Sequence, residues 1–201
     1  VVLRLQRDVD DCVLMQIGKN TKNGIVPSFQ LPGVKQERGE TYKDALERLF
    51  EAKLSGLIDK TQVASLGSYR ETVQKESKEF VVCTRYMRTV CSASFARGFI
   101  ETASCMVSDL TQEICHAETK AEVVRTLLER PVWTSSDETV YAWVSTEESV
   151  LLSGPAGEAL LKRWVSALRF PGQDPRPSAG SRDDAASEDD AGQHSDTSFS
   201  F

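Results

Sequence analysis

The stretch that most constrains the fold covers residues 31–57 and reads LPGVKQERGETYKDALERLFEAKLSGL. It opens on Leu31-Pro32-Gly33, where proline and glycine end a short extended segment. Thr41, with Asp44 three residues further on, predicts the N-cap of a helix. Apolar residues then recur at helical spacing until Ser55-Gly56, which predicts the helix end. The stretch therefore predicts an extended segment, a glycine-containing loop and one amphipathic helix.

Short apolar segments on both sides of this helix predict a sheet. Strands are expected at residues 1–5, 12–17, 29–33, 63–69, 80–90 and 139–144. Two further helices are expected at residues 108–130, where Pro131 ends the pattern, and at 158–168. Residues 18–24 are predicted as a loop and the polar residues 71–78 as a hairpin. Trp133, between the second helix and the last strand, is expected to be exposed.

Charge divides the chain into a near-neutral body and an acidic tail. The 201 residues are 40% hydrophobic and carry a net charge of −6, which suits one globular domain. Residues 171–201 contain seven acidic residues and two arginines, a net charge of −5, so residues 1–170 carry a net charge of only −1. A nucleic-acid surface normally needs a basic excess, so nucleic-acid binding is not expected.

Residues 171–201 consist largely of proline, glycine, serine, alanine and acidic residues. Such a composition cannot bury enough apolar area to offset the entropy of ordering, so we predict a disordered acidic tail. Its Ser/Asp/Glu segment, residues 181–198, is similar to acidophilic phosphorylation sites, although plain linkers share this composition.

Cysteine usage and hydropathy bear on the compartment. The five cysteines have no CxxC spacing and lie mostly among apolar neighbours, which predicts reduced thiols. Two histidines are too few to favour a Cys/His zinc site. No apolar run approaches the roughly 20 residues of a membrane span and no signal peptide is visible, so an intracellular location (cytoplasm, nucleus or organelle matrix) is expected. The chain begins at Val1 rather than Met, which leaves open a longer parent protein.

The order of the expected elements, together with residues 31–57, resembles the Nudix hydrolase family. The family signature is Gly-x5-Glu-x7-Arg-Glu-U-x-Glu-Glu-x-Gly-U, where U is aliphatic, and it usually follows Leu-Pro-Gly. Gly39-Glu40-Thr41 matches the usual Gly-Glu-Ser/Thr, and Arg48 follows Glu40 with the required seven residues between them. Residues 64–69 and 141–148 are similar to a middle strand and a late Trp-containing element of the family. The resemblance covers about residues 1–170, with an insertion at about 96–134, and implies an α/β sandwich with a mixed sheet flanked by helices.

The signature is degenerate at its metal-binding positions. In the family the ligands come chiefly from the Glu after the Arg and from the later Glu-Glu pair. Those positions hold Leu49, Ala52 and Lys53, which helical spacing places on one face about 100° wide. Mg²⁺ and Mn²⁺ require oxygen ligands, and in such a site they neutralise a diphosphate and help activate water. We therefore expect no metal site and no cofactor, and assign no catalytic residue.

Two roles at the signature need no metal. The resemblance implies that Glu40 and Arg48 form an ion pair that braces the loop against the helix. Lys53 places an ammonium where a metal ligand belongs, so it could contact a phosphate together with Gly33, Lys35 and Gly39. The alternative for Lys53 is an ordinary solvent-reaching side chain. Carboxylates from elsewhere could replace the missing ligands, and the candidates are Glu37, Glu71, Glu76, Glu79 and Glu101.

Two hypotheses of function follow. The favoured one is a catalytically inactive or impaired Nudix-like domain that binds a nucleotide diphosphate or another phosphate, or serves as a scaffold. Its protein partner would dock on the predicted helix 108–130 or on the tail. The alternative is a divergent Nudix hydrolase that cleaves nucleoside diphosphate-linked substrates with an unusual Mg²⁺ or Mn²⁺ site.

Deleting residues 171–201 should leave the melting temperature nearly unchanged, because a disordered tail contributes no packed contacts. Thermal unfolding of the full and truncated chains, followed by circular dichroism, checks this. A drop of several degrees would instead mean that the tail packs on the domain through Phe199 or Phe201.

Overall fold

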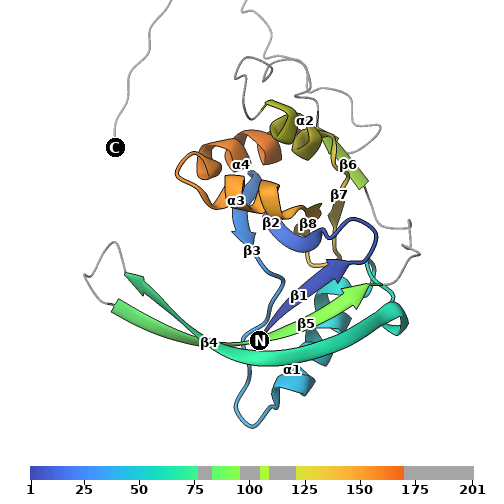
Figure 1. Cartoon of the computed structure of the whole chain (residues 1–201), viewed down its shortest axis with the longest axis vertical. Coiled ribbons are helices and arrows are strands. Elements are labelled where there is room, and N and C mark those ends of the chain that lie inside the picture. The colour runs from blue at the N-terminus through green and yellow to red at the C-terminus, as the bar shows by residue number, and fades with distance from the viewer. Residues whose placement is uncertain (77–82, 96–104, 109–120, 170–201) are drawn as a thin grey trace, which may run out of the picture.

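A computed structural model of the chain describes residues 1–76, 83–95, 105–108 and 121–169 (Figure 1). Nine strands of these residues form one connected mixed sheet in the order β4-β5-β1-β2-β8-β7-β6-β9, with β3 also paired to β2. The strands are β1 (Val2–Arg7), β2 (Val13–Thr21), β3 (Gly24–Gln30), β4 (Val63–Glu76), β5 (Cys83–Phe95), β6 (Cys105–Ser108), β7 (Val132–Thr134), β8 (Thr139–Val144) and β9 (Leu168–Arg169). Only the β1–β5 pair is parallel among the strand pairs of the described ranges.

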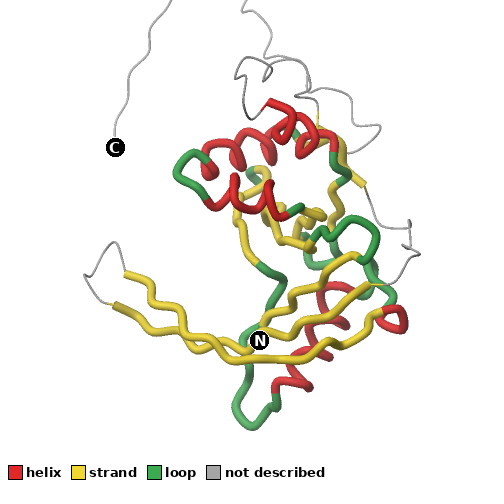
Figure 2. Tube along the Cα trace, in the orientation of Figure 1, coloured by secondary structure: helices red, strands yellow, loops and turns green. Residues whose placement is uncertain are grey.

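The helices lie in two groups on opposite sides of this sheet (Figure 2). They are α1 (Tyr42–Leu49) with its π-helical continuation η1 (Phe50–Leu54), the short turn η2 (Lys60–Gln62), α2 (Ala121–Glu129), α3 (Thr146–Ser153) and α4 (Gly157–Ser166). Within the described ranges, none of these helices has the length and apolar character needed to cross a membrane. A mixed sheet flanked by helices confirms the predicted α/β class.

Strand β8 divides the protein interior into two cores. Tyr141 and Trp143 belong to the apolar cluster that includes Leu49 of α1, whereas Ala142 and Val144 belong to the cluster that includes residues of α2, α3 and α4. Because side chains alternate along a strand, helices on both faces bury all six residues of β8. The predicted strand 139–144 is therefore confirmed at both ends.

The predicted loop at residues 18–24 is wrong, since most of it belongs to the β2–β3 hairpin. Strand β2 continues to Thr21, and β3 begins at Gly24. The register of β2 shifts between Gln16 and Gly18 against both neighbouring strands, which marks a bulge. A Cβ at Gly18 would lie 2.6 Å from Ile25 Cγ2, so glycine permits this close approach. The polar residues of this segment predicted a loop, but hydrogen bonds between the backbones of paired strands form the hairpin whatever the side chains are.

The predicted insertion at 96–134 is not simply helical, because it contributes strands to the sheet. The helix expected at 108–130 cannot begin at Ser108, the last residue of β6; α2 covers Ala121–Glu129, and residues 109–120 lie outside the described residues. Trp133 is in β7 and only 9% exposed, so the expectation that it is exposed is wrong. The tail predicted to be disordered also lies outside the described residues.

The last helical region contains two helices rather than one. Helix α3 was not predicted; its N-cap Ser145 and Glu148 form a reciprocal capping box. Helix α4 ends at Ser166, before the predicted end at Leu168, because Leu168 pairs with β6 as part of β9. Short helices of this kind depend on caps and tertiary contacts more than on a long amphipathic pattern.

A buried ion pair joins the end of α2 to α3. Arg130 Nε lies 2.8 and 2.9 Å from the two carboxylate oxygens of Glu148, which is 1% exposed. The backbone N–H of Ser145 also donates to Glu148 Oε2 at 2.7 Å. Asp10 approaches Arg130 to 4.0 Å from the β1–β2 turn. Glu148 therefore serves both the helix cap and the inter-helix contact.

Replacing Arg130 with Met should cost about 3 kcal/mol of unfolding free energy, because it leaves the Glu148 carboxylate buried without its cation. Urea denaturation measures this cost. The matched control is Lys162→Met, which removes one partner of the exposed Lys162–Glu158 pair within α4 and should cost less than about 1 kcal/mol. Equal costs for the two variants would contradict the role of burial.

Candidate functional site

The loop that precedes α1 is attached to the first strand by backbone contacts. Leu3 N–H donates to Pro32 O at 2.8 Å, Val34 N–H donates to Val1 O at 3.0 Å, and Val2 forms an isolated bridge with Gly33. A Cβ at position 33 would lie 2.9 Å from Val1 O, which explains the glycine there. The Leu-Pro-Gly segment thus sets the position at which the loop leaves the sheet.

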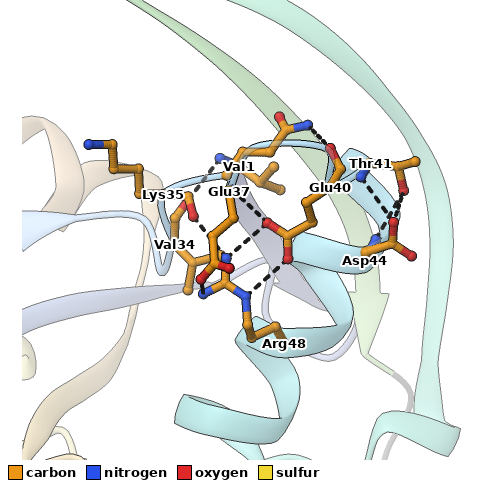
Figure 3. A network of polar contacts seen from close by, with 9 residues as sticks. Val1, Val34, Lys35, Glu37, Glu40, Thr41, Asp44 and Arg48 are labelled. Carbon is orange, nitrogen blue, oxygen red and sulfur yellow. Dashed lines mark hydrogen bonds and ion pairs between the residues drawn. The ribbon is translucent and has the colours of Figure 1, made fainter.

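Glu40 and Arg48 form the expected ion pair between the loop and α1 (Figure 3). Arg48 Nε and Nη2 donate to the two carboxylate oxygens of Glu40 at 3.0 and 2.9 Å, and Nη2 also donates to Lys35 O at 2.9 Å. The same carboxylate accepts from Glu37 N–H at 2.8 Å. The hydrogen bonds from Arg48, followed by that from Glu37, lower the pKa of Glu40 from its ordinary value. Arg48 is therefore engaged in bracing the loop.

The start of α1 follows the predicted pattern. Gly39 adopts φ +85°, a conformation that favours glycine, just before the helix cap. Thr41 N–H donates to Asp44 Oδ2 at 2.9 Å and Asp44 N–H donates to Thr41 Oγ1 at 3.3 Å, so both members of a capping box are present (Figure 3). This cap fixes the beginning of the signature helix.

The three degenerate signature positions differ in burial. Leu49 is fully buried in the core beneath the sheet, Ala52 is exposed, and Lys53 is half-buried. After Leu49 the helix changes to the π form over Phe50–Leu54, whose i→i+5 turns are wider than those of an α-helix. The predicted helix is therefore not α-helical throughout. A carboxylate at position 49 would face apolar side chains.

Lys53 points back to the Leu-Pro-Gly segment. Its Nζ donates to Gly33 O at 3.1 Å. Its charge also acts on Asp137, which the sequence did not single out. Burial alone would raise the pKa of Asp137. Hydrogen bonds from Ser135 and Thr139, together with the charge of Lys53, outweigh burial and lower this pKa. Asp137 lies in the tight turn before β8, and the sequence alone gives an acidic residue there no role beyond that of an ordinary turn residue.

A cavity of about 560 Å³ opens between the loop and the helix. It is lined by Gly33, Val34, Lys35, Gln36, Glu37, Arg38, Arg48 and Lys53. Of the four residues predicted to contact phosphate, three line this cavity, and Gly39 does not. The lining holds four basic side chains and one acid, so the cavity is suited to an anion.

A second cavity of about 290 Å³, here called the β4–α3 cavity, lies beside β1, β2, β4, β5 and the start of α3. It is lined by Arg4, Val13, Met15, Leu31, Tyr69, Glu71, Arg88, Val144, Ser145, Thr146, Ser149 and Val150. Glu71 is ion-paired with Arg88 there. Leu31 lines this cavity and Gly33 lines the loop cavity, so the two cavities flank the Leu-Pro-Gly segment.

The candidate replacement carboxylates are scattered. Glu37 lines the loop cavity and Glu71 lines the β4–α3 cavity, while Glu79 and Glu101 lie outside the described residues. Across the described ranges, no group of three or more His, Cys, Asp or Glu side chains is arranged to hold a metal ion. The residues present in the loop cavity therefore fit an anion better than a divalent cation.

Several solved structures are partly similar to this chain. The chain resembles the crystal structure of a Nudix hydrolase from M. smegmatis, RenU, with a TM-score of 0.34 and 20% identity, over 49% of this chain and 61% of that one. The likeness thus spans less than two thirds of the other protein. No protein-family model and no curated protein matches the sequence.

Substituting Glu at Leu49 and at Ala52 should have opposite outcomes. Leu49→Glu places a carboxylate in the apolar core and should cost more than about 4 kcal/mol, enough to unfold many domains. Ala52→Glu lies on the surface and should change the unfolding free energy by less than about 0.5 kcal/mol. Urea denaturation of both variants checks this; a folded and stable Leu49→Glu protein would mean that the helix register is different.

Proposed function

We propose that this chain is a non-catalytic Nudix-like module that binds the phosphate end of a nucleotide diphosphate or related ligand without a metal ion. The observation that carries the proposal is the pair of substitutions at the signature helix. Leu49 is buried where a carboxylate ligand belongs, and the Lys53 ammonium occupies another ligand position. A cation fixed in the protein would replace part of the charge that Mg²⁺ supplies in the family.

Lys53 is the central group of the proposed phosphate site. An ammonium has three donors, and Gly33 O accepts from one of them at 3.1 Å, which leaves two for a ligand. Lys35 and Arg38 line the same cavity and are exposed, so they can approach an anion at little cost. Arg48 already donates to Glu40 and Lys35 O, so its role is to hold the loop. The site would bind phosphate oxygens by charge-assisted hydrogen bonds.

The β4–α3 cavity could hold the rest of such a ligand. Its lining includes the apolar side chains of Met15 and Val144 and the partly exposed Tyr69. Arg4 and the hydroxyl of Ser149 add polar groups that would orient a bound molecule. The lining also includes the ion-paired side chains of Glu71 and Arg88, and the volume of about 290 Å³ is close to the lower limit for small-molecule sites.

The alternative, a divergent hydrolase, has one observation in its favour. Asp137 is close enough to Lys53 for the Lys53 charge to lower its pKa, so an ionised carboxylate lies near the signature helix. Asp137 does not line the loop cavity that holds Glu37, so a metal site that used both carboxylates would need a bound substrate phosphate between them. That reading predicts turnover that depends on Mg²⁺ or Mn²⁺ and on Asp137.

Calorimetric titration with ADP and with pyrophosphate, in EDTA and in Mg²⁺, tests the binding proposal. Binding should occur in EDTA, and Lys53→Gln should weaken it about tenfold, because a charge-assisted contact is lost. Lys60→Gln is the matched control, since Lys60 pairs with Glu47 on the exposed side of the helix and should leave affinity unchanged. No binding to either probe, or equal loss in both variants, would contradict the phosphate site.

The non-catalytic part has its own test. Incubation with ADP-ribose, dinucleoside polyphosphates, oxidised nucleoside triphosphates or capped RNA, in Mg²⁺ or Mn²⁺, should give no product above a no-enzyme control. Metal-dependent turnover that Asp137→Asn abolishes would favour the hydrolase alternative instead.

A further inference from the structure

The β4–β5 hairpin extends beyond the rest of the sheet. Strand β1 supports β5 only from Val90 onward, where Val2 is its partner. The pairs from Arg70↔Thr89 to Glu76↔Cys83 continue the hairpin past that point, with no third strand among the described residues. Figure 1 shows this two-stranded arm leaving the body of the protein.

An isolated two-stranded ribbon is at best marginally stable in water. Strand β4 is also the terminal strand of the sheet, so its outer edge has no partner strand within the described ranges. Exposed apolar side chains accompany this edge and arm, among them Leu66 at 66%, Tyr86 at 53% and Met87 at 83% exposed. Long exposed edges of this kind are sites of strand addition.

The sequence of β4 is complementary to itself in one antiparallel register. If two copies of β4 pair about a two-fold axis centred on Val73, then Arg70 is opposite Glu76 and Glu71 is opposite Lys75 of the other copy. Each pair occurs twice, because a two-fold interface is isologous. Opposite charges facing each other across a strand pair are stabilising.

Other registers of β4 lack this complementarity. Opposed residues must point to the same face, so the axis must pass through a residue rather than between two residues. Registers centred on position 70, 71 or 72 place no acid of β4 opposite a base of β4. Residues 83–89, the β5 side of the arm, contain no acid at all and cannot form such pairs with themselves. The charge pattern therefore selects β4 and selects a second copy of this chain.

We infer that two copies of the chain associate through their β4 edges, in the register centred on Val73, and join the two arms into a four-stranded antiparallel ribbon. The association does not depend on the proposed phosphate site, which lies on the loop and helix after β3. It supplies each arm with the third strand that the monomer lacks.

The test measures the mass of the full chain by analytical ultracentrifugation, with circular dichroism to verify folding. The wild-type chain should be a dimer. Arg70→Glu and Glu76→Arg should each weaken self-association by at least about tenfold, because two attractive pairs become repulsive. Mixed one to one, these two variants should associate again, since Glu at position 70 of one then faces Arg at position 76 of the other. Arg125→Glu, an exposed change on α2, is the control and should remain dimeric.

The mixture of the two variants also distinguishes a lost interface from a lost fold, because two unfolded variants would not restore a dimer. A monomeric wild-type chain at the highest soluble concentration would overturn the inference. So would a dimer that survives either charge reversal, or a mixture of the two folded variants that stays monomeric.

Discussion

The close contact between Gly33 and the first residues of β1 is the constraint on which the candidate site depends. The backbone of residues 32–34 exchanges hydrogen bonds with that of residues 1–3, and no side chain would fit at position 33. This contact fixes the Gly33 carbonyl, which accepts from Lys53, and it fixes the loop that Arg48 and Glu40 then close. The loop cavity is thus defined largely by backbone geometry, and its charge is supplied by side chains arranged around that frame.

The change of helix type after Leu49 decides which side chains reach the cavity. In the α-helical part, Ala45 and Leu49 pack into the core. The wider π turns then place Phe50 and Leu54 in the same core, while Lys53 remains half-buried and returns to the loop. Extra-wide turns are frequent at functional sites because they re-aim side chains without ending a helix. The burial of Leu49 belongs to the α-helical part, and the placement of Lys53 belongs to the π part.

Much of the fold could be predicted from local sequence, and the failures have identifiable causes. The Thr41 cap and the β8 strand were predicted because their signals are short-range: a side-chain hydrogen bond in one case and a continuous apolar run in the other. The β2–β3 hairpin was missed because its stability comes from partner strands rather than from its own polar residues. The extent of β6 and β9 depends on pairing between distant residues, which no local pattern records.

The same distinction applies to the candidate site. The Glu40–Arg48 pair follows from signature spacing within one loop and helix. The placement of Leu49 in the core agrees with its α-helical spacing from Ala45, whereas the π form of the next turn has no local sequence signal. Asp137 comes from a turn about 80 residues further along the chain, so only the folded sheet brings it near Lys53.

The parallel pairing of β1 with β5 has a consequence for the order of folding. Val2 pairs with Val90, so one of the central ladders of the sheet closes a very long loop. Contacts between such distant residues slow folding, because the chain entropy is lost before the contact is gained. During synthesis β1 must wait for β5 to leave the ribosome, and until then one of its edges has no partner. The β2–β3 hairpin, whose strands are adjacent, can form much earlier and is the natural nucleus on which the later strands assemble.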